Sequence, residues 1–176
     1  MLSAVQIKPD VYAVGAIDWN AREFHGYTTE QGITYNAYLI LDEKITLIDT
    51  VKYTMTDELI ERIQSIVDPA KIDVVVCNHI EMDPSSSLPA ILKVAPNAAV
   101  YASAPQGVKE LKAFYGEDLE VNGVKTGDTL SIGKRTLHFV QTPMVHWPDN
   151  MVTYSDVDKI LFSNDAFGQH YAPSTR

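Results

Sequence analysis

The sequence predicts an α/β fold of the layered α+β kind, in which helices stack against mixed β-sheets. The expected elements follow the order strands, helix, strand, helix, strand, helix, strands. Residues 73–79 (DVVVCNH) contain an unbroken apolar run, which is typical of a strand buried on both faces. The sequence contains no glycine-rich phosphate loop, so a doubly wound Rossmann sheet that binds a nucleotide has no support.

The first part of the chain is expected to be mostly β-structure. Strand-like runs, rich in β-branched and aromatic residues, lie at residues 10–18, 34–42 and 44–50. The last two runs are joined by a short turn at Asp42–Glu43.

Residues 56–68 (TDELIERIQSIVD) predict the first helix. Thr56 can cap its first turn, Asp57 and Glu58 favour the positive N-terminus, and Pro69 is expected to end it. Its apolar stripe consists of Leu59, Ile60, Ile63, Ile66 and Val67.

The middle of the chain alternates between strand and helix. After the buried strand, the expected elements are a helix at 86–95, a strand at 98–103 and a helix at 105–116. The last of these helices has Pro105 near its start and Gly116 past its end, the usual asymmetry of helix termini.

The rest of the chain is rich in β-structure. The expected strands lie within residues 119–133, 135–143 and 150–165, and turn signals occur at Asn122–Gly123, Gly127–Asp128 and Asp156–Asp158. Residues 166–176 follow as a loop. We therefore expect one domain over residues 1–176, with an incomplete last layer.

The composition fits one globular domain with a substantial core, because 45% of the 176 residues are hydrophobic. The net charge of −9 would repel a phosphate backbone, which argues against nucleic-acid binding. No apolar run approaches the roughly 18 residues needed to span a bilayer, and the N-terminus lacks a signal-peptide pattern. The one cysteine, Cys77, reads as a small buried hydrophobe and fits a reducing cytoplasm.

Five side chains of the kind that bind metals follow apolar runs, at expected strand-to-loop junctions: His79, Glu81, Asp83, His146 and Asp165. The first three alternate along the chain, and alternate side chains of extended backbone face the same way about 6.5–7 Å apart. They can converge where the chain leaves the strand end, the usual place for α/β sites.

Electrostatics favours a cation among these residues. Three carboxylates crowded together repel one another and raise one another's pKa values unless a cation lies between them. Imidazole and carboxylate without thiolate suit iron, manganese or zinc. The competing interpretation, separate polar residues at loop starts, is favoured for each residue alone but not for all five together.

The segment NHIEMDPSSSLP resembles the His-x-Glu-x-Asp-His motif of flavodiiron proteins, oxygen and nitric-oxide reductases built on a metallo-β-lactamase fold. Other segments similar to that family's N-terminal domain are FHGYTTEQGITYNAYLI, TLIDTV, TPMVHWPDNMVTY and LFSNDAFGQHYA. Glu81 stands where the hydrolytic relatives carry a second histidine. The resemblance implies a metallo-β-lactamase-like αββα sandwich, incomplete at the C-terminus.

The resemblance also implies a ligand set: His79, Glu81 and His146 on a first iron, Asp165 bridging, and Asp83 on a second iron. His25, in EFHGYTT, matches a family histidine close to the diiron centre. From the sequence alone, His25 is expected to lie beside the centre rather than to bind metal directly.

Two departures from the family pattern concern the second iron. Pro84 replaces a histidine ligand, offers no lone pair, and is expected to bias Asp83 toward extended backbone. The family's final histidine lies beyond the segment that matches Arg176. We therefore expect the second site to be empty or weakly filled.

Several other polar residues are weaker candidates. His138 is expected to face solvent, His170 is a possible neighbour of the site, and Trp147 is expected to pack as its wall. Asp49 is either a carboxylate that supports the metal loop or an ordinary strand end. Ser85–Ser87 read as a helix cap, because no Ser-His-Asp arrangement is evident.

Three functional hypotheses remain. The favoured one is the metal-binding module of a flavodiiron-type oxidoreductase that reduces O₂ or NO, inactive as this chain alone. FMN would come from another domain or chain, electrons from a rubredoxin- or flavin-type protein, and the family resemblance implies a homodimer. The others are a hydrolase that uses one metal to generate hydroxide, and a non-catalytic metal-binding or dimerisation module.

Overall fold

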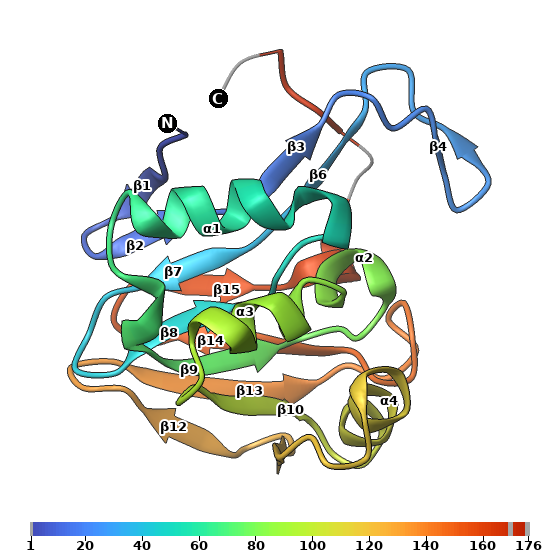
Figure 1. Ribbon diagram of the computed structural model, residues 1–176. Helices are drawn as coiled ribbons and strands as arrows, with labels where there is room; N and C mark the ends of the chain where they lie inside the picture. The colour runs from blue at the N-terminus through green and yellow to red at the C-terminus, as the bar shows by residue number, and fades with distance from the viewer. Residues whose placement is uncertain (1, 169–170, 175–176) are drawn as a thin grey trace.

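The computed structural model describes residues 2–168 and 171–174, which form stacked layers of helices and sheets (Figure 1). The helices are α1 (Thr56–Gln64), α2 (Met82–Ser85), α3 (Leu88–Val94) and α4 (Gln106–Tyr115), with short 3-10 helices η1 (Tyr53–Met55), η2 (Pro69–Lys71) and η3 (Asn164–Phe167). The larger sheet contains, in spatial order, β1 (Val5–Lys8), β2 (Val11–Ala13), β7 (Tyr38–Ile40), β8 (Ile45–Ile48), β9 (Ile72–Cys77), β10 (Ala99–Ser103) and β11 (Val121–Val124). The second sheet contains β12 (Thr129–Ser131), β13 (Thr136–Gln141), β14 (Met151–Ser155) and β15 (Ile160–Phe162). Two short antiparallel pairs complete the fold: β3 (Ala16–Asp18) with β6 (Ile33–Tyr35), and β4 (Glu23–Phe24) with β5 (Tyr27–Thr28).

The larger sheet is mixed, which confirms the layered α/β prediction. Strands β1, β2, β7 and β8 pair antiparallel, whereas β8, β9, β10 and β11 pair parallel. Each parallel connection passes through a helix: α1 leads to β9, α3 to β10 and α4 to β11. These helices cover one face of the larger sheet, and the second sheet lies behind its other face (Figure 1).

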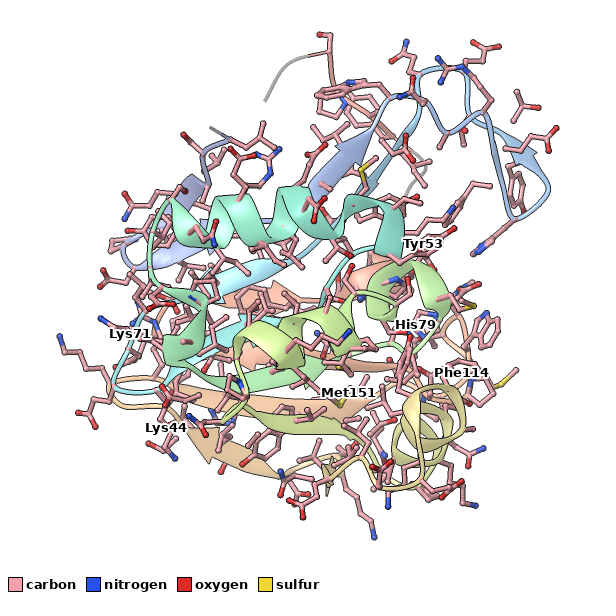
Figure 2. All side chains as sticks on the ribbon, in the orientation of Figure 1. Lys44, Tyr53, Lys71, His79, Phe114 and Met151 are labelled. Atoms are coloured by element: carbon pink, nitrogen blue, oxygen red, sulfur yellow. The ribbon has the colours of Figure 1, made fainter. Side chains whose placement is uncertain are left out.

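Strand β9 shows why its sequence is continuously apolar. Val75 and Cys77 belong to the core between the larger sheet and the helices, whereas Val74 and Val76 belong to the core between the two sheets. Both faces of the strand are therefore buried, and each buried valine contributes about 1.5–3 kcal/mol relative to an exposed one. Figure 2 shows Lys44 and Lys71, which precede β8 and β9, at the opposite end of the sheets from His79.

Among the described residues, the helices form a layer on one side of the sandwich. In residues 2–168 and 171–174, no helix packs on the outer face of the second sheet, where Val140 and Leu161 are exposed. The described part of the αββα arrangement thus comprises three layers. None of its helices has both the length and the apolar character needed to cross a bilayer.

The predicted turn at Asn122–Gly123 is wrong, because both residues lie inside β11 and pair with β10. The glycine serves close packing instead. A Cβ atom at Gly123 would lie 2.8 Å from the Cβ of Ala104 and 3.1 Å from a methyl carbon of Val108. The turns at Gly127–Asp128 and Asp156–Asp158 are confirmed.

The first helix is shorter than predicted and is not capped by Thr56. The chain enters α1 from η1, and the Thr56 hydroxyl donates to the carbonyl of Tyr53 at 2.7 Å. At the other end the Ser65 hydroxyl donates to the Arg62 carbonyl at 2.7 Å, a local bond that competes with helix continuation. Pro69 begins η2 rather than ending α1.

The long strands predicted at 10–18 and 34–42 are each divided in two. Val14 and Gly15 both donate to the carbonyl of Ala37, at 2.9 and 3.1 Å, where the chain leaves the larger sheet. Beyond this point β3 and β6 form a separate pair that leads to the β4–β5 hairpin, which projects at the upper right of Figure 1. That hairpin, which was not predicted, carries His25.

A buried ion-pair cluster connects the two sheets. The Arg135 guanidinium donates to both carboxylate oxygens of Asp158, at 2.8 and 3.1 Å, and to Asp42 at 3.2 Å. It also donates to the carbonyl of Pro9 at 2.8 Å. All three charged side chains are 6% exposed or less.

Replacing Arg135 by methionine is expected to lower the free energy of unfolding by about 3–5 kcal/mol, because two buried carboxylates lose their cation. Chemical denaturation measures this change. The neighbouring exposed Lys134 supplies the matched control, since K134M removes the same kind of charge without breaking a buried pair. An equal loss of unfolding free energy in the two variants would contradict the conclusion that the buried ion pairs of Arg135 stabilise the fold.

Candidate metal centre

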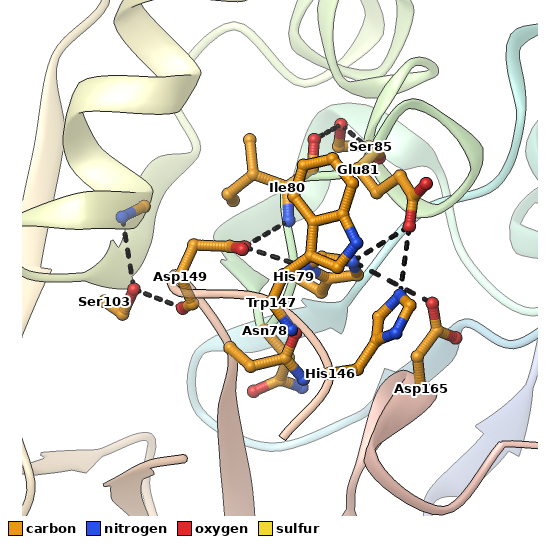
Figure 3. Close-up of polar contacts among 12 residues, drawn as sticks. Asn78, His79, Ile80, Glu81, Ser85, Ser103, His146, Trp147, Asp149 and Asp165 are labelled. Atoms are coloured by element: carbon orange, nitrogen blue, oxygen red, sulfur yellow. Dashed lines mark hydrogen bonds and ion pairs between the residues drawn. The ribbon is translucent and has the colours of Figure 1, made fainter. Parts of the chain in front are cut away.

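The predicted ligands gather at one end of the sandwich, just beyond the ends of three strands. His79 and Glu81 follow β9, His146 lies in the loop between β13 and β14, and Asp165 lies in η3 directly after β15. Because β13 and β15 both pair antiparallel with β14, their ends meet at the same edge. Figure 3 shows His79, Glu81, His146 and Asp165 pointing toward one another.

His79 is completely buried and makes a different contact with each ring nitrogen. Its Nδ1 lies 2.9 Å from Oδ2 of Asp149, so a proton on Nδ1 is donated to that carboxylate. Its Nε2 lies 3.2 Å from Oε2 of Glu81 and 3.9 Å from Oδ2 of Asp165, and it is the nitrogen that is left with a lone pair for a metal when the imidazole is neutral. This arrangement fixes the tautomer that a metal ligand needs.

Glu81 lies between three imidazoles. Its Oε2 is 3.3 Å from Nε2 of His146 as well as close to His79, whereas its Oε1 is 2.8 Å from Nε2 of His25. The rings of His25 and His146 lie nearly parallel, with centroids 6.4 Å apart. The His25 ring also stacks on Phe24.

Two overlapping sets of potential ligand atoms result, each with its atoms within 4.8 Å of one another. The first consists of His79, Glu81, His146 and Asp165; the second consists of His25, Glu81 and Asp83. A cavity of about 400 Å³ adjoins both sets, and its lining includes His25, Asp83, His146 and Asp165. The structure therefore brings all five predicted residues, and also His25, to one place.

Two contacts of the first set have the spacing of ligands on a divalent cation, whereas Nε2 of His79 and Oδ2 of Asp165 are farther apart, at 3.9 Å. Ligands that lie about 2.1 Å from an ion, at 90–109° to each other, are separated by about 3.0–3.4 Å. The contacts of Glu81 with His79 and His146, at 3.2 and 3.3 Å, fall in this range. Imidazole and carboxylate donors of this kind suit iron, manganese or zinc.

The charges of the site also fit a cation. Burial, together with the charges of Asp165 and Glu81, raises the pKa of Asp83 to about 7. Burial likewise raises the pKa of Asp165. Burial opposes the charged form of His79, but hydrogen bonds to Asp149 and Glu81 outweigh it and raise the pKa of this imidazole to about 10. Without metal, the site holds protons where it would otherwise hold a cation.

Asp83 departs from its predicted backbone conformation. It lies in helix α2 rather than in extended structure, although Pro84 follows it. The proline is tolerated because it occupies the first turn, where its missing N–H would have no helical partner. Oδ1 of Asp83 is buried and has no hydrogen-bond partner.

Asp149 was missed by sequence reasoning. Besides His79, its Oδ2 accepts a hydrogen bond from the backbone N–H of Ile80 at 2.7 Å, and its main-chain carbonyl accepts one from the Ser103 hydroxyl (Figure 3). One chemical rule could have pointed to it: a histidine ligand usually donates its second N–H to a carboxylate. Asp149 lies close to His146 in the sequence, but no sequence pattern indicated that it contacts His79.

Asp49 supports the loop that carries His79. Its two carboxylate oxygens accept hydrogen bonds from the backbone N–H and the side-chain amide of Asn78, at 2.7 and 2.9 Å. Burial raises the pKa of Asp49 to about 6, although hydrogen bonds from Asn78 and Asn164 oppose the shift. Asp49 thus contacts Asn78, which precedes His79, and Asn164, which precedes Asp165. These contacts favour a carboxylate that supports the metal loop over a residue that merely ends a strand.

The weaker candidates lie as follows. His138 is partly exposed and faces Asp156 at 3.8 Å, and Trp147 packs with its ring centroid 5.7 Å from that of His79. Ser87 is the N-cap residue of α3, as predicted, but its side chain makes no capping hydrogen bond. The Ser85 hydroxyl contacts Ile80, Glu81 and Tyr115. His170 lies outside the described residues.

The fold and the site together define a metallo-β-lactamase-like sandwich with a cluster of histidine and carboxylate ligands. The family model described as "ODP family beta lactamase" matches residues 33–175. The chain therefore belongs to the ODP family of beta-lactamase-like domains.

The relatives found include flavodiiron proteins. The chain is 47% identical to the rubredoxin-oxygen oxidoreductase of Megalodesulfovibrio gigas and 46% identical to the nitric oxide reductase of Moorella thermoacetica. It is covered almost completely in both comparisons, but it spans only 44% and 45% of those relatives.

Solved structures agree with the sequence relatives. The structure of rubredoxin oxygen:oxidoreductase from Desulfovibrio gigas matches 99% of the chain with a TM-score of 0.94 and 47% identity. The flavodiiron protein from Giardia intestinalis matches all of it with a TM-score of 0.94 and 45% identity. The chain covers 44% and 43% of those two structures. The predicted fold and the predicted family are both confirmed.

Asp149→Asn is expected to weaken binding of a divalent cation by about 10- to 100-fold, because His79 loses the carboxylate that orients it and raises its basicity. Competition with a chromogenic chelator measures the affinity. Asp156→Asn is the matched control, since Asp156 lies 3.8 Å from His138, a histidine away from the site. Equal affinity in the two variants would contradict the role of Asp149.

Asp83→Asn is expected to stabilise the metal-free protein at pH 8 by on the order of 1–2 kcal/mol. The folded state binds the Asp83 proton more tightly than the unfolded state does, because the folded pKa is about 7. Wild-type stability therefore falls as the pH rises from about 4 through 7, and asparagine removes this loss.

The difference between wild type and Asp83→Asn should vanish near pH 4. Denaturation in EDTA at several pH values tests this, with the exposed Glu120→Gln as a control. A loss of stability at pH 8 in the Asp83 variant would show that its charge is not repelled in the fold.

Proposed function

We propose that this chain is the metal-binding part of a flavodiiron-type oxidoreductase that reduces O₂, NO or both at a non-haem iron centre. One observation carries the proposal: His79, Glu81, His146 and Asp165 place imidazole and carboxylate donors within 4.8 Å of one another. The relatives named as a nitric oxide reductase and a rubredoxin-oxygen oxidoreductase support the choice of chemistry.

The residues of the chain have separate tasks in this proposal. His79 and His146 would hold iron through Nε2, and Glu81 and Asp165 through carboxylate oxygens. Iron bound there supplies redox chemistry and open coordination positions. Asp149 keeps the proton of His79 on Nδ1 at 2.9 Å, so that Nε2 stays available as a donor.

The surroundings of the site suit a small substrate. The cavity of about 400 Å³ beside the ligands is bounded by Phe24, Ile33 and Tyr35 as well as by charged groups. A diatomic gas needs no dedicated polar contacts, so a cavity with these apolar groups beside the ligands can admit it. The choice between O₂ and NO does not follow from the ligands, because both gases bind the same kind of iron centre.

Electrons have to reach the site from outside the described residues. We include in the proposal an FMN group supplied by another domain or chain, with a rubredoxin- or flavin-type protein as donor. Met144 and Val145, next to His146, and Phe167, close to Asp165, are exposed apolar side chains at the site. A homodimer in which a partner covers these side chains fits this arrangement.

The proposed location is the cytoplasm. The single cysteine, Cys77, is buried and unpaired, which fits a reducing compartment.

The test is iron binding and gas reduction under anaerobic preparation. The protein loaded with Fe²⁺ is expected to retain iron and to consume O₂ or NO when a reduced flavoprotein donor is added. His79→Ala and His146→Ala should each lower iron retention and turnover at least tenfold, because each removes one of four ligands. His138→Ala, which removes a histidine remote from the site, should change neither.

Two results would contradict the proposal. One is absence of iron binding by the wild-type protein under iron-replete conditions, which would favour a non-catalytic module. The other is zinc-dependent hydrolysis of a lactam or thioester that disappears in His79→Ala, which would favour the hydrolase that uses metal-bound hydroxide.

A further inference from the structure

The pair Asn122–Gly123, which the sequence predicts to be a turn, lies inside strand β11. An asparagine followed by glycine is open to attack by the next backbone nitrogen on its side-chain amide, because glycine has no side chain to hinder the approach. When the Gly123 nitrogen attacks Cγ of Asn122, the new C–N bond closes a five-membered succinimide ring. The side-chain nitrogen leaves as ammonia with the proton of the Gly123 N–H. Water then opens the ring to aspartate or to isoaspartate, in which the main chain runs through the side-chain carbons.

The pair is not shielded from water. Asn122 and Gly123 are both exposed, and β11 is an edge strand of the larger sheet, with β10 as its neighbour. Burial therefore gives the asparagine no protection, and any protection has to come from the conformation of the strand.

The conformation of β11 opposes closure of the ring. The succinimide contains the bond between Cα and the carbonyl carbon of Asn122, so ring closure rotates this bond away from the value of an extended strand. The pairing of residues 121–124 with residues 100–103 of β10 resists that rotation. The side-chain amide is also held, because its Nδ2 donates to the carbonyl of Val100 at 3.1 Å.

The isoaspartate product does not fit the strand. It adds one carbon atom to the main chain, which breaks the register of Gly123 and Val124 with β10. Gly123 has no room for a shift, because even a Cβ there would lie 2.8 Å from the Cβ of Ala104 and 3.1 Å from a methyl carbon of Val108. Val124 belongs to the core between the two sheets, and its carbonyl accepts a hydrogen bond from the N–H of Ala104 at 2.9 Å. A displaced β11 loses both contacts.

We propose that Asn122 is a deamidation site that the native fold blocks and unfolding exposes, and that its isoaspartate product prevents β11 from forming again. The native protein keeps the amide, whereas the unfolded chain loses it and with it the ability to refold. Time spent unfolded becomes irreversible loss of native protein through chemical modification. The site lies away from the metal centre and does not depend on the proposed function.

The experiment compares native protein with protein unfolded in guanidinium chloride, both kept at the same mildly alkaline pH and temperature. Peptide mass spectrometry follows deamidation at Asn122, with Asn97, an exposed asparagine followed by alanine, as the internal control. Loss of the Asn122 amide is expected to be at least tenfold faster in the unfolded chain than in the native protein. In the unfolded chain it should also exceed the loss at Asn97, because the alanine side chain hinders the attack.

Timed samples of the unfolded protein are then diluted from denaturant, and recovery of native protein is measured by circular dichroism. Wild-type recovery should fall as isoaspartate accumulates, and the fraction that fails to refold should be enriched in it. Asn122→Gln, whose longer side chain closes a ring far more slowly, should keep its recovery. Freshly unfolded Asn122→Asp, which has the charge of a deamidated product on an unaltered main chain, should refold as well as fresh wild-type protein.

Several results would overturn the inference. One is deamidation of Asn122 in the native protein at a rate within tenfold of that in the unfolded chain. Others are recovery that does not depend on isoaspartate content, and equal loss of recovery in Asn122→Gln. Failure of fresh Asn122→Asp to refold would assign the damage to charge rather than to the main chain. If wild-type protein does not refold even after brief unfolding, the ratio of the two deamidation rates decides, and a ratio below ten overturns the site.

Discussion

Mutual repulsion between carboxylates is the constraint on which this end of the molecule depends. Asp83 and Asp165 line one cavity, and Glu81 shares a set of potential ligands with each of them. Burial makes these charges more costly than they would be in water. In the metal-free protein, a raised pKa on two of them and on His79 relieves part of that cost. A cation relieves it without protons, so the same arrangement that destabilises the empty fold favours metal binding.

The remainder of the fold holds these groups in place against that repulsion. Strand β9 is buried on both faces, so the backbone that ends at Cys77 has little freedom to move. Asp49 then fixes the next residue, Asn78, through two hydrogen bonds, and Asp149 fixes His79 and Ile80. The ligands are thus positioned by rigid elements and by hydrogen bonds that do not involve metal, an arrangement suited to precise coordination.

Much of this could be predicted from the sequence, because the signals were local. The apolar run of β9 and the polar residues that follow it indicated both the layers and the metal centre. What failed depended on distant contacts. Asp149 meets His79 across 70 positions of the chain, and Gly123 is required by the approach of Ala104. The short helix α2, which contains Asp83, is held by Thr50, whose N–H and hydroxyl both donate to the Pro84 carbonyl. No local pattern around these residues encodes such tertiary contacts.

The position of Glu81 among three imidazoles has a consequence for how this edge responds to substitution. One carboxylate oxygen contacts His25 and the other contacts His79 and His146, so a change in any one ring alters the carboxylate that the other two contact. Substitutions at these three positions are therefore expected to have non-additive effects on stability, because all of them act through a shared partner.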